Sequence, residues 1–508
     1  MRRLRLVLGI AIAVFTASPG YAESSRSTLV INATIIDGTG APARRASLRV
    51  TGDRIGDIGD LQPRRGETVI DARNHIVAPG FIDCHSHLDV VAKPEANAAI
   101  SQGVTTIIVG PDGFSQSPLS RYFRDVAAAH PAVNVGSFSG HNTLRAQAMP
   151  ENDNHRPASA AEIAAMQRAL ATDMRAGAIG LSSGLAYETG LFSSTDEVVA
   201  LNEAAAPRGG LYSSHMRNED DEVESAVREL IDIGARTGGP VHVSHIKIST
   251  MRLWGVAPRI IAQLEAARAT NVDTSADIYP YTAWNTTMRI LFRNSNFADP
   301  SGPAAIFRDV VPADKIVLEA YAPNPALAGR NIAEIAHERG VDPAALYVSL
   351  MQDVLAYQAA HPDEHEVEGI IGTGMDERDV ERFMSWANTS ICSDGSDGGH
   401  PRGYGTFARV LGVYMRERGV LGLEDAIRKM THLNATQMSI AERGVLRRGA
   451  FADIVIFDRE TVVDRATMKE PTLLATGFDL VMVNGQVVYR DGKRTDARPG
   501  RIVRRYRT

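Results

Sequence analysis

Strand-like and helix-like segments alternate through the middle of the chain, and this alternation constrains the fold more than any other feature. Eight short runs are rich in apolar and β-branched residues, at 81–87, 103–110, 134–142, 177–184, 210–217, 240–247, 272–281 and 389–394. The segments between them have helical periodicity. Eight repeats of strand and helix are typical of an α/β protein whose parallel strands close into a (β/α)8 TIM barrel.

Helix-capping signals support this interpretation. Ser159 and Glu162 form the pattern of a capping box ahead of an apolar helical stripe, and Ser194 and Glu197 repeat it. A further helix is predicted over 221–236, where Gly238 follows its last turn.

The two ends of the chain have a different residue pattern. Short β-rich runs at 28–36, 47–51 and 68–71 are separated by Gly-Asp and Asp-Gly turns, and similar runs return at 454–458 and 480–489. We expect both ends to form one small β-sandwich domain, residues 23–79 plus 437–508, beside a barrel over residues 80–436.

One connection is too long for a simple loop. About a hundred residues separate the seventh and eighth strand-like runs, and they contain helical patterns at 331–339 and 343–354. We expect an inserted subdomain at about 288–370 that lies over the barrel mouth.

The first residues resemble an export signal. Three arginines lie within residues 1–5, an apolar run follows at 6–15, and small residues surround Tyr21. Residues 1–22 are therefore predicted to be a bacterial signal peptide, which gives a periplasmic or secreted protein. The apolar run is too short to span a bilayer, so no membrane insertion is expected after its removal.

Charge and cysteine content exclude other classes. The formal net charge is -6 among 508 residues, which offers no overall positive charge to attract nucleic acid. Only two cysteines are present, Cys84 and Cys392, and by strand alternation Cys84 is expected to face outward and Cys392 inward. Both thiols are therefore predicted to be free.

Metal-competent side chains follow several of the predicted strands. His85 and His87 end the first, His215 the fifth, His245 the sixth and Asp394 the eighth. Because reactive groups of such barrels lie at the C-terminal ends of the strands, these five side chains are expected to meet around a metal ion. His242 differs from His245 in parity and is expected to face outward.

Two metals close together need a bridging ligand. No lysine lies between Lys93 and Lys247, so a carboxylated lysine on the fourth strand is excluded. Asp112, just after the second strand, is the remaining candidate, although Pro-Asp-Gly is also a common turn. Imidazole and carboxylate ligands suit zinc, with manganese and iron as alternatives.

A substrate carboxylate would need cations and hydroxyl donors beside the metals. Lys247, Tyr279, Tyr187 and Arg402 lie at strand ends or on the loops that follow and are candidates for substrate binding. His141 ends the third strand-like run and is expected either to contact substrate or to make a structural hydrogen bond.

Seven motifs together resemble the amidohydrolase superfamily, and within it the N-acyl-D-amino-acid deacylases (D-aminoacylases). They are Phe-Ile-Asp-Cys-His-Ser-His at 81–87, Gly-Val-Thr-Thr at 103–106, Gly-Leu-Ser-Ser-Gly-Leu-Ala-Tyr at 180–187, Ser-His-Met-Arg-Asn-Glu at 214–219, Ser-His-Ile-Lys at 244–247, Asp-Ile-Tyr-Pro-Tyr at 277–281 and Ser-Asp-Gly at 393–395. The resemblance covers nearly all of the chain after residue 22.

The resemblance implies a site with one tight zinc and a weaker second position. It assigns His215 and His245 to the tight metal, His85 and His87 to the other, and makes Asp394 the catalytic carboxylate. Asp394 would take a proton from the attacking water and return it to the departing amine.

The implied reaction is hydrolysis of an N-acyl-D-amino acid, a small-molecule substrate, to a carboxylate and a free D-amino acid. The chain departs from the family at Asp112, where a cysteine usually stands. Two alternatives are a dipeptidase or cyclic-amide hydrolase with the same metals, and a non-catalytic periplasmic protein that binds a small ligand.

Overall fold

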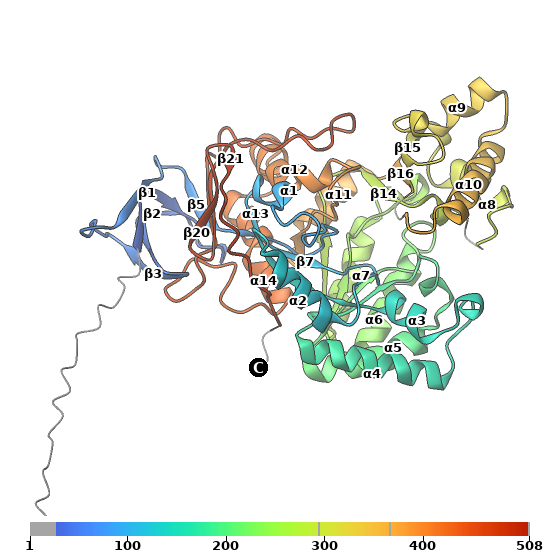
Figure 1. The fold of residues 1–508 in the computed structure, drawn as a ribbon, viewed down its shortest axis with the longest axis horizontal. Helices are drawn as coiled ribbons and strands as arrows, with labels where there is room; N and C mark the ends of the chain where they lie inside the picture. Colours follow the sequence, from blue (N-terminus) through green and yellow to red (C-terminus); the bar gives the residue numbers. More distant parts are fainter. Residues whose placement is uncertain (1–26, 293–294, 365–366, 506–508) are drawn as a thin grey trace, which may run out of the picture.

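The computed structural model describes residues 27–292, 295–364 and 367–505, and it contains the eight predicted barrel strands (Figure 1). All eight are shorter than the sequence pattern indicated. In chain order they are β6 (Phe81–Asp83), β7 (Val104–Val109), β8 (Asn134–Ser137) with its continuation β9 (Ser139–Gly140), β10 (Gly180–Gly184), β11 (Leu211–His215), β12 (Val241–Val243), β13 (Thr274–Ile278) and β17 (Thr389–Ile391).

The strands form two parallel sheets that join into a closed barrel. One sheet has the order β6-β7-β8 and the other β17-β13-β12-β11-β10-β9. The first junction lies at Ile179, whose N–H donates to the Ser137 carbonyl at 2.9 Å. The second joins chain segments some three hundred residues apart, because Ser86 pairs in parallel with Gly395 and the Asp394 N–H donates to the His85 carbonyl at 2.9 Å.

Helices follow the strands and pack around them. They are α1 (Asn97–Ile100), α2 (Leu119–Ala129), α3 (His141–Ala148), α4 (Ala160–Ala176), α5 (Thr195–Ala205), α6 (Val223–Thr237), α7 (Ala257–Ala269), α11 (Glu377–Ser385), α12 (Arg402–Arg409), α13 (Leu423–Met430) and α14 (His432–Gln437). The capping box predicted at Ser159 and Glu162 is present at the start of α4.

The second capping signal is only half confirmed. Ser194 accepts a hydrogen bond from the Glu197 N–H, as predicted, and α5 begins after it. The Glu197 side chain does not return to the cap, because it turns into the protein and binds His141 and Arg145. A buried ion pair therefore overrides the local capping pattern.

The two chain ends meet in one nine-stranded sheet with its own apolar core. Its order is β21-β20-β19-β18-β5-β1-β2-β3, and β4 pairs with β1. These strands are β1 (Ser27–Ile35), β2 (Arg44–Thr51), β3 (Arg54–Gly59), β4 (Thr68–Asp71), β5 (Ile76–Pro79), β18 (Ile454–Phe457), β19 (Phe478–Val483), β20 (Gln486–Arg490) and β21 (Lys493–Arg494). Strand β5 leads directly into β6, so this sheet holds the first barrel strand in place (Figure 1).

The long connection between β13 and β17 forms a lobe on the opposite side of the barrel from the terminal sheet (Figure 1). It contains an antiparallel sheet of order β14-β16-β15 as well as the expected helices. The elements are β14 (Ala283–Thr286), α8 (Ser301–Asp309), β15 (Ile316–Tyr321), α9 (Ile332–Arg339), α10 (Pro343–Ala360) and β16 (Glu368–Thr373). The sequence pattern indicated the helices α9 and α10 and missed the strands.

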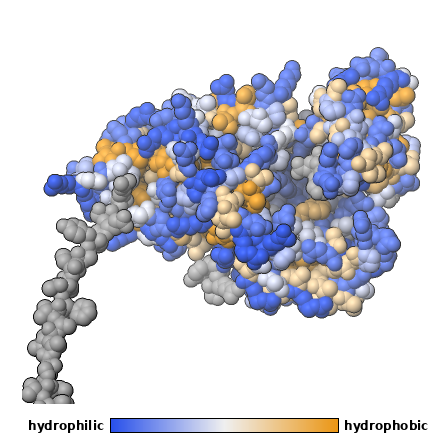
Figure 2. Space-filling model, viewed as in Figure 1, coloured by the Kyte–Doolittle hydropathy of each residue, from blue (hydrophilic) through white to orange (hydrophobic). Residues whose placement is uncertain are grey.

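Polar side chains cover most of the face seen in Figure 2, with small apolar patches among them. Within the described residues, no helix is both long and apolar enough to cross a bilayer. The predicted signal peptide, residues 1–22, lies outside the described residues.

Candidate metal centre

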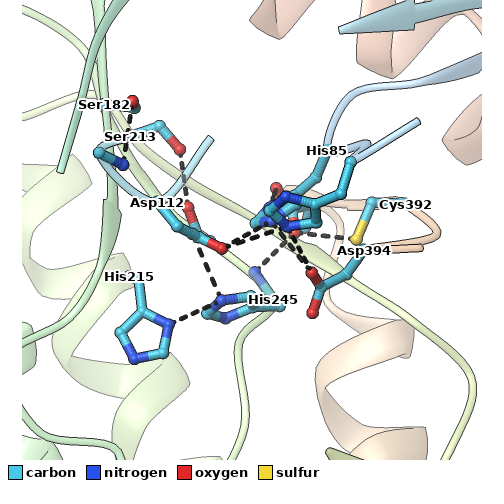
Figure 3. A network of polar contacts seen from close by, with 12 residues as sticks. His85, Asp112, Ser182, Ser213, His215, His245, Cys392 and Asp394 are labelled. Carbon is cyan, nitrogen blue, oxygen red and sulfur yellow. Dashed lines mark hydrogen bonds and ion pairs between the residues drawn. The ribbon is translucent and has the colours of Figure 1, made fainter. Parts of the chain in front are cut away.

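Histidine and aspartate side chains from five strand ends converge at the C-terminal mouth of the barrel. Figure 3 shows four of them, His85, Asp112, His245 and Asp394, pointing toward one another, with His215 beside His245. The structure thus brings together all the metal-ligand candidates that the sequence indicated, including His87.

The first cluster contains His85, His87, Asp112 and Asp394, whose ligand atoms all lie within 4.8 Å of one another. His85 Nε2 lies 3.1 Å from Asp112 Oδ2 and 3.3 Å from Asp394 Oδ1. His87 Nε2 lies 3.1 Å from the same Asp394 oxygen, and its side chain is 38% exposed. Three of the four residues are therefore buried, and the cluster is reachable from solvent at His87.

The second cluster contains Asp112, His215 and His245, within the same 4.8 Å limit. His245 Nε2 lies 3.4 Å from Asp112 Oδ1 and 2.9 Å from His215 Nδ1. Asp112 therefore belongs to both clusters, with Oδ2 directed to the first and Oδ1 to the second. This position suits a bridging ligand between two metal ions.

Three of these ligand candidates have a left-handed backbone conformation. The φ angles are 54° at Asp112, 36° at His245 and 47° at Asp394. Non-glycine residues rarely adopt this conformation, and it is concentrated at functional sites. The chain therefore leaves the extended conformation at the positions where it presents these side chains.

The donor set fits a divalent metal. Imidazole nitrogens and carboxylate oxygens face one another without apolar separation, and Asp112 Oδ1 is buried without a hydrogen-bond donor. A buried carboxylate oxygen in this state is costly unless a cation lies beside it. The mixture of imidazole nitrogen and carboxylate oxygen ligands suits zinc.

The electrostatics of the first cluster favour a cation. Burial tends to lower the pKa of His85, but the Asp112, Asp277 and Asp394 carboxylates raise it well above its usual range. Burial likewise tends to raise the pKa of Asp394, yet Arg402 and His85 hold it well below its usual range. A site that binds a proton this tightly on His85 also attracts a metal, which competes for the same nitrogen.

Within the second cluster, His215 differs from His85 in its protonation state, whereas the pKa of His245, despite its burial, is raised to about 9 by the Asp112, Glu219 and Asp394 carboxylates. Burial lowers the pKa of His215 to about 4, which leaves its imidazole neutral at neutral pH. A neutral imidazole is the form that binds a metal. His215 is therefore prepared for coordination without loss of a proton.

Two buried carboxylates that the sequence analysis did not select hold these histidines in place. Asp277 lies 3.5 Å from His85 Nδ1 through Oδ2, and its Oδ1 accepts a hydrogen bond from the His245 N–H at 2.6 Å. Glu219 lies 3.2 Å from His245 Nδ1 and 3.6 Å from His215 Nε2. Carboxylates in this position fix the orientation of metal-binding imidazoles.

Both residues lie in motifs that resemble the family, but neither was predicted to support a metal ligand. Asp277 begins Asp-Ile-Tyr-Pro-Tyr and Glu219 ends Ser-His-Met-Arg-Asn-Glu. Their positions in the sequence could have suggested this role, because Asp277 lies within β13 and Glu219 lies four residues after His215.

The structure corrects two predictions made from strand alternation. Cys84 and His242 were expected to face outward, but both approach Asp277 below the metal clusters, and His242 Nε2 lies 2.9 Å from its Oδ2. Strands β6 and β12 end at Asp83 and Val243, so alternation does not extend through Cys84 to His87 or through His245. Cys84 and Cys392 are both free, as predicted, and both are buried.

Four of the substrate-binding candidates lie around the clusters, and one of them is Lys247, whose Nζ lies 2.8 Å from His245 Nδ1. Arg402 Nη1 contacts Asp394 Oδ2 at 2.7 Å, and its guanidinium lies over the Tyr279 ring at 4.7 Å. The Tyr187 ring lies 4.4 Å from the His215 ring. Arg402 is therefore beside the first cluster and Tyr187 beside the second.

Lys247 and His141 each contact a buried glutamate. Lys247 Nζ lies 2.6 Å from Glu219 Oε2, so its charge is already balanced. His141 begins α3 rather than ending a strand, is fully buried, and lies 3.0 Å from Glu197 Oε1. Of the two roles expected for His141, the structure shows the structural hydrogen bond and no contact with either cluster.

Comparison with known proteins gives three close relatives over nearly the whole chain. The sequence profile of the Amidohydrolase family matches residues 68–387 and 317–489. The chain is 38% identical to an N-acyl-D-glutamate deacylase of Alcaligenes xylosoxydans xylosoxydans, over 93% of this chain and 95% of the relative.

Two solved structures share the fold and more than a third of the sequence. An N-acyl-D-glutamate deacylase from Bordetella bronchiseptica, in complex with zinc and a phosphonate mimic of the tetrahedral intermediate, superposes with a TM-score of 0.84 at 37% identity, covering 94% of this chain and 99% of the other. A D-aminoacylase solved to define the role of its binuclear metal centre gives 0.83 at 36%, with the same coverage.

Proposed function

Because this chain belongs to the amidohydrolase family, we propose that it is a zinc-dependent deacylase that hydrolyses N-acyl-D-amino acids to a carboxylate and a free D-amino acid. Its partner in this reaction is a small molecule that carries an amide and a free carboxylate. The D configuration is inferred from the relatives, which act on N-acyl-D-amino acids.

The observation that carries the proposal is the position of Asp394. Its Oδ1 lies among the ligands of the first cluster, while its Oδ2 contacts Arg402 at 2.7 Å. One carboxylate thus lies beside both the metal ligands and the cation available to a substrate carboxylate. This position suits amide hydrolysis, because one carboxylate has to take a proton from water and then donate it to the leaving amine.

Asp394 transfers the proton in the proposed reaction. His85 and His87 would hold one metal ion and His215 with His245 the other, and Asp112 is within reach of both positions. A bound zinc ion supplies a Lewis acid and lowers the pKa of water to about 7. Asp394 is ionised, since Arg402 and His85 hold its pKa well below the usual range, so it accepts the proton of the attacking water and passes it to the amine nitrogen.

Arg402 and Tyr279 orient the substrate. The guanidinium lies over the Tyr279 ring and is itself buried, with 5% of its surface exposed. A buried guanidinium with one carboxylate partner can donate bidentate hydrogen bonds to a second carboxylate. We assign the substrate carboxylate to this arginine, and assign Lys247 to the support of Glu219.

Stereospecific hydrolysis tests the proposal. The zinc-loaded protein is mixed with N-acetyl-D- and N-acetyl-L-amino acids, and the free amine is measured. We expect release from the D forms and at least tenfold slower release from the L forms. Release from neither series would refute the proposed function.

We further propose that the protein is exported and acts in the periplasm or outside the cell. The support is the arginine-rich start, the apolar run at 6–15 and the small residues that follow. N-terminal sequencing of the protein from a periplasmic fraction should begin near residue 23. Recovery of the chain in the cytoplasm with residues 1–22 intact would refute this.

A further inference from the structure

Phe114 is an exposed aromatic side chain beside the metal-ligand clusters. Its relative exposure is 52%, the highest among the large apolar residues that are exposed in the described part of the chain. It lies two residues after Asp112 on the loop that follows β7, at the barrel mouth. The exposed ring therefore offers apolar surface to a molecule bound at the barrel mouth.

The turn that presents Asp112 inward also fixes Phe114. Asp112 and Gly113 have φ angles of 54° and 82°, and the Phe114 N–H donates to the Pro111 carbonyl at 3.1 Å. A Cβ atom at Gly113 would lie 2.0 Å from Asn142 Oδ1, so only glycine fits here. The metal-ligand candidate and the exposed ring are therefore two parts of one rigid turn.

An aromatic path connects Phe114 with the second cluster. The Phe114 ring lies 5.9 Å from the Tyr187 ring, which in turn lies 4.4 Å from the His215 ring. The two rings thus form a fixed apolar wall that runs outward from His215.

The direction of proton transfer decides which half of the substrate meets this wall. Asp394 returns its proton to the amine, and Arg402 lies on Asp394, so the amino-acid half lies at that end of the site. Asp112 lies between Asp394 and the second cluster. The acyl half therefore extends past Asp112 toward His215, Tyr187 and Phe114.

We propose that Phe114 and Tyr187 form the acyl subsite and that this subsite selects long apolar or aromatic acyl groups over acetyl. The proposal rests on the proposed deacylase function and adds to it the class of acyl group. Phe114 is a specificity-determining residue in this scheme, because it contacts the acyl chain and not the scissile bond.

The test compares two substrates that differ only in acyl length. N-octanoyl and N-acetyl derivatives of the same D-amino acid are assayed with the zinc-loaded wild type and the Phe114→Ala variant. We expect kcat/KM for the octanoyl substrate to exceed that for the acetyl substrate in the wild type. In Phe114→Ala this ratio should fall about tenfold, as expected for the loss of one half-covered aromatic ring.

A matched control is Met468→Ala. Met468 is 48% exposed, similar to Phe114, but lies between β18 and β19 of the terminal sheet. This variant should keep the wild-type ratio and the wild-type activity. A ratio that is unchanged in Phe114→Ala, or a wild type that prefers acetyl, would overturn the proposal.

A binding measurement separates this proposal from the proposed function. Octanoate and acetate, two possible carboxylate products, are titrated into the zinc-loaded protein by calorimetry. We expect octanoate to bind at least tenfold more tightly than acetate, and Phe114→Ala to remove most of this difference. Equal binding of the two acids would overturn the acyl subsite even if hydrolysis is observed, whereas absence of all hydrolysis would refute the deacylase function.

Discussion

Asp277 gives the sharpest test of how the barrel supports the metal centre. Its carboxylate is 1% exposed and contacts the His245 N–H at 2.6 Å, His242 Nε2 at 2.9 Å, Cys392 Sγ at 3.0 Å and His85 Nδ1 at 3.5 Å. Asp277→Asn keeps the shape and the Oδ1 acceptor, but it removes the negative charge and turns Oδ2 into a donor. In the variant, residue 277 therefore no longer supports the His85 imidazole, and no cavity is created.

The expected loss is one to two orders of magnitude in zinc affinity. The substitution removes the buried ion pair at 3.5 Å between Asp277 Oδ2 and His85 Nδ1. Loss of a carboxylate behind a metal-binding histidine has effects of the same size, about 10–100-fold. The zinc dissociation constants of wild type and Asp277→Asn are measured by competition with a chelator, and the spectrum of the cobalt-substituted protein reports the ligand geometry.

Asp173→Asn is the matched control. Asp173 is also 1% exposed, and it accepts hydrogen bonds from the Leu119 N–H at 2.9 Å and the Ser139 hydroxyl at 2.8 Å, outside both clusters. This variant should lose stability and keep the wild-type zinc affinity. If Asp277→Asn bound zinc as tightly as the wild type, Asp277 would serve barrel packing alone, and our account of its role would be wrong.

Three further predictions concern single side chains. Asp394→Asn should lower kcat by about 10²–10⁴-fold at saturating zinc, because the proton acceptor is lost; an unchanged kcat would refute the mechanism. Asp112→Asn should lower the zinc content per chain, measured by elemental analysis, since Asp112 belongs to both clusters; an unchanged zinc content would contradict the bridging role. Lys429 concerns stability, because burial lowers its pKa from the usual 10.5 to about 8. Between these values the unfolded chain holds the proton and the folded protein does not, so the free energy of unfolding should rise with pH by about 3 kcal/mol. Urea denaturation at pH 7.5 and 10 should show this rise in the wild type and a smaller one in Lys429→Met; equal rises would contradict the assignment.

Much of the fold was readable from local patterns. The eight barrel strands fell inside predicted runs, because an apolar run bounded by turn residues has few other ways to bury its side chains. The ends of the strands were less accurate. Strand β6 ends at Asp83, four residues before the predicted end, because the chain leaves the sheet to present its histidines.

The residues of the site could be predicted from the sequence, but the positions of their side chains could not. His85, His215, His245 and Asp394 were identified because strand ends of a parallel barrel meet at one face. Cys84 and His242 were misplaced because alternation assumes an extended backbone, and the chain departs from it with φ of 36° at His245 and 47° at Asp394. Glu197 was assigned to a helix cap because its partners His141 and Arg145 lie more than fifty residues away along the chain.

Local residue patterns predicted the eight barrel strands and several of the helices between them. They also predicted which side chains can bind a metal and excluded a lysine that bridges two metals on the fourth strand. Contacts between distant segments were needed to show that Asp112 belongs to both clusters, that Asp277 and Glu219 support the histidines, and that Lys247 pairs with Glu219. The reason is physical. Periodicity and capping depend on neighbours a few residues apart, whereas a buried charge is positioned by partners that the closed barrel brings within 4 Å from distant parts of the chain.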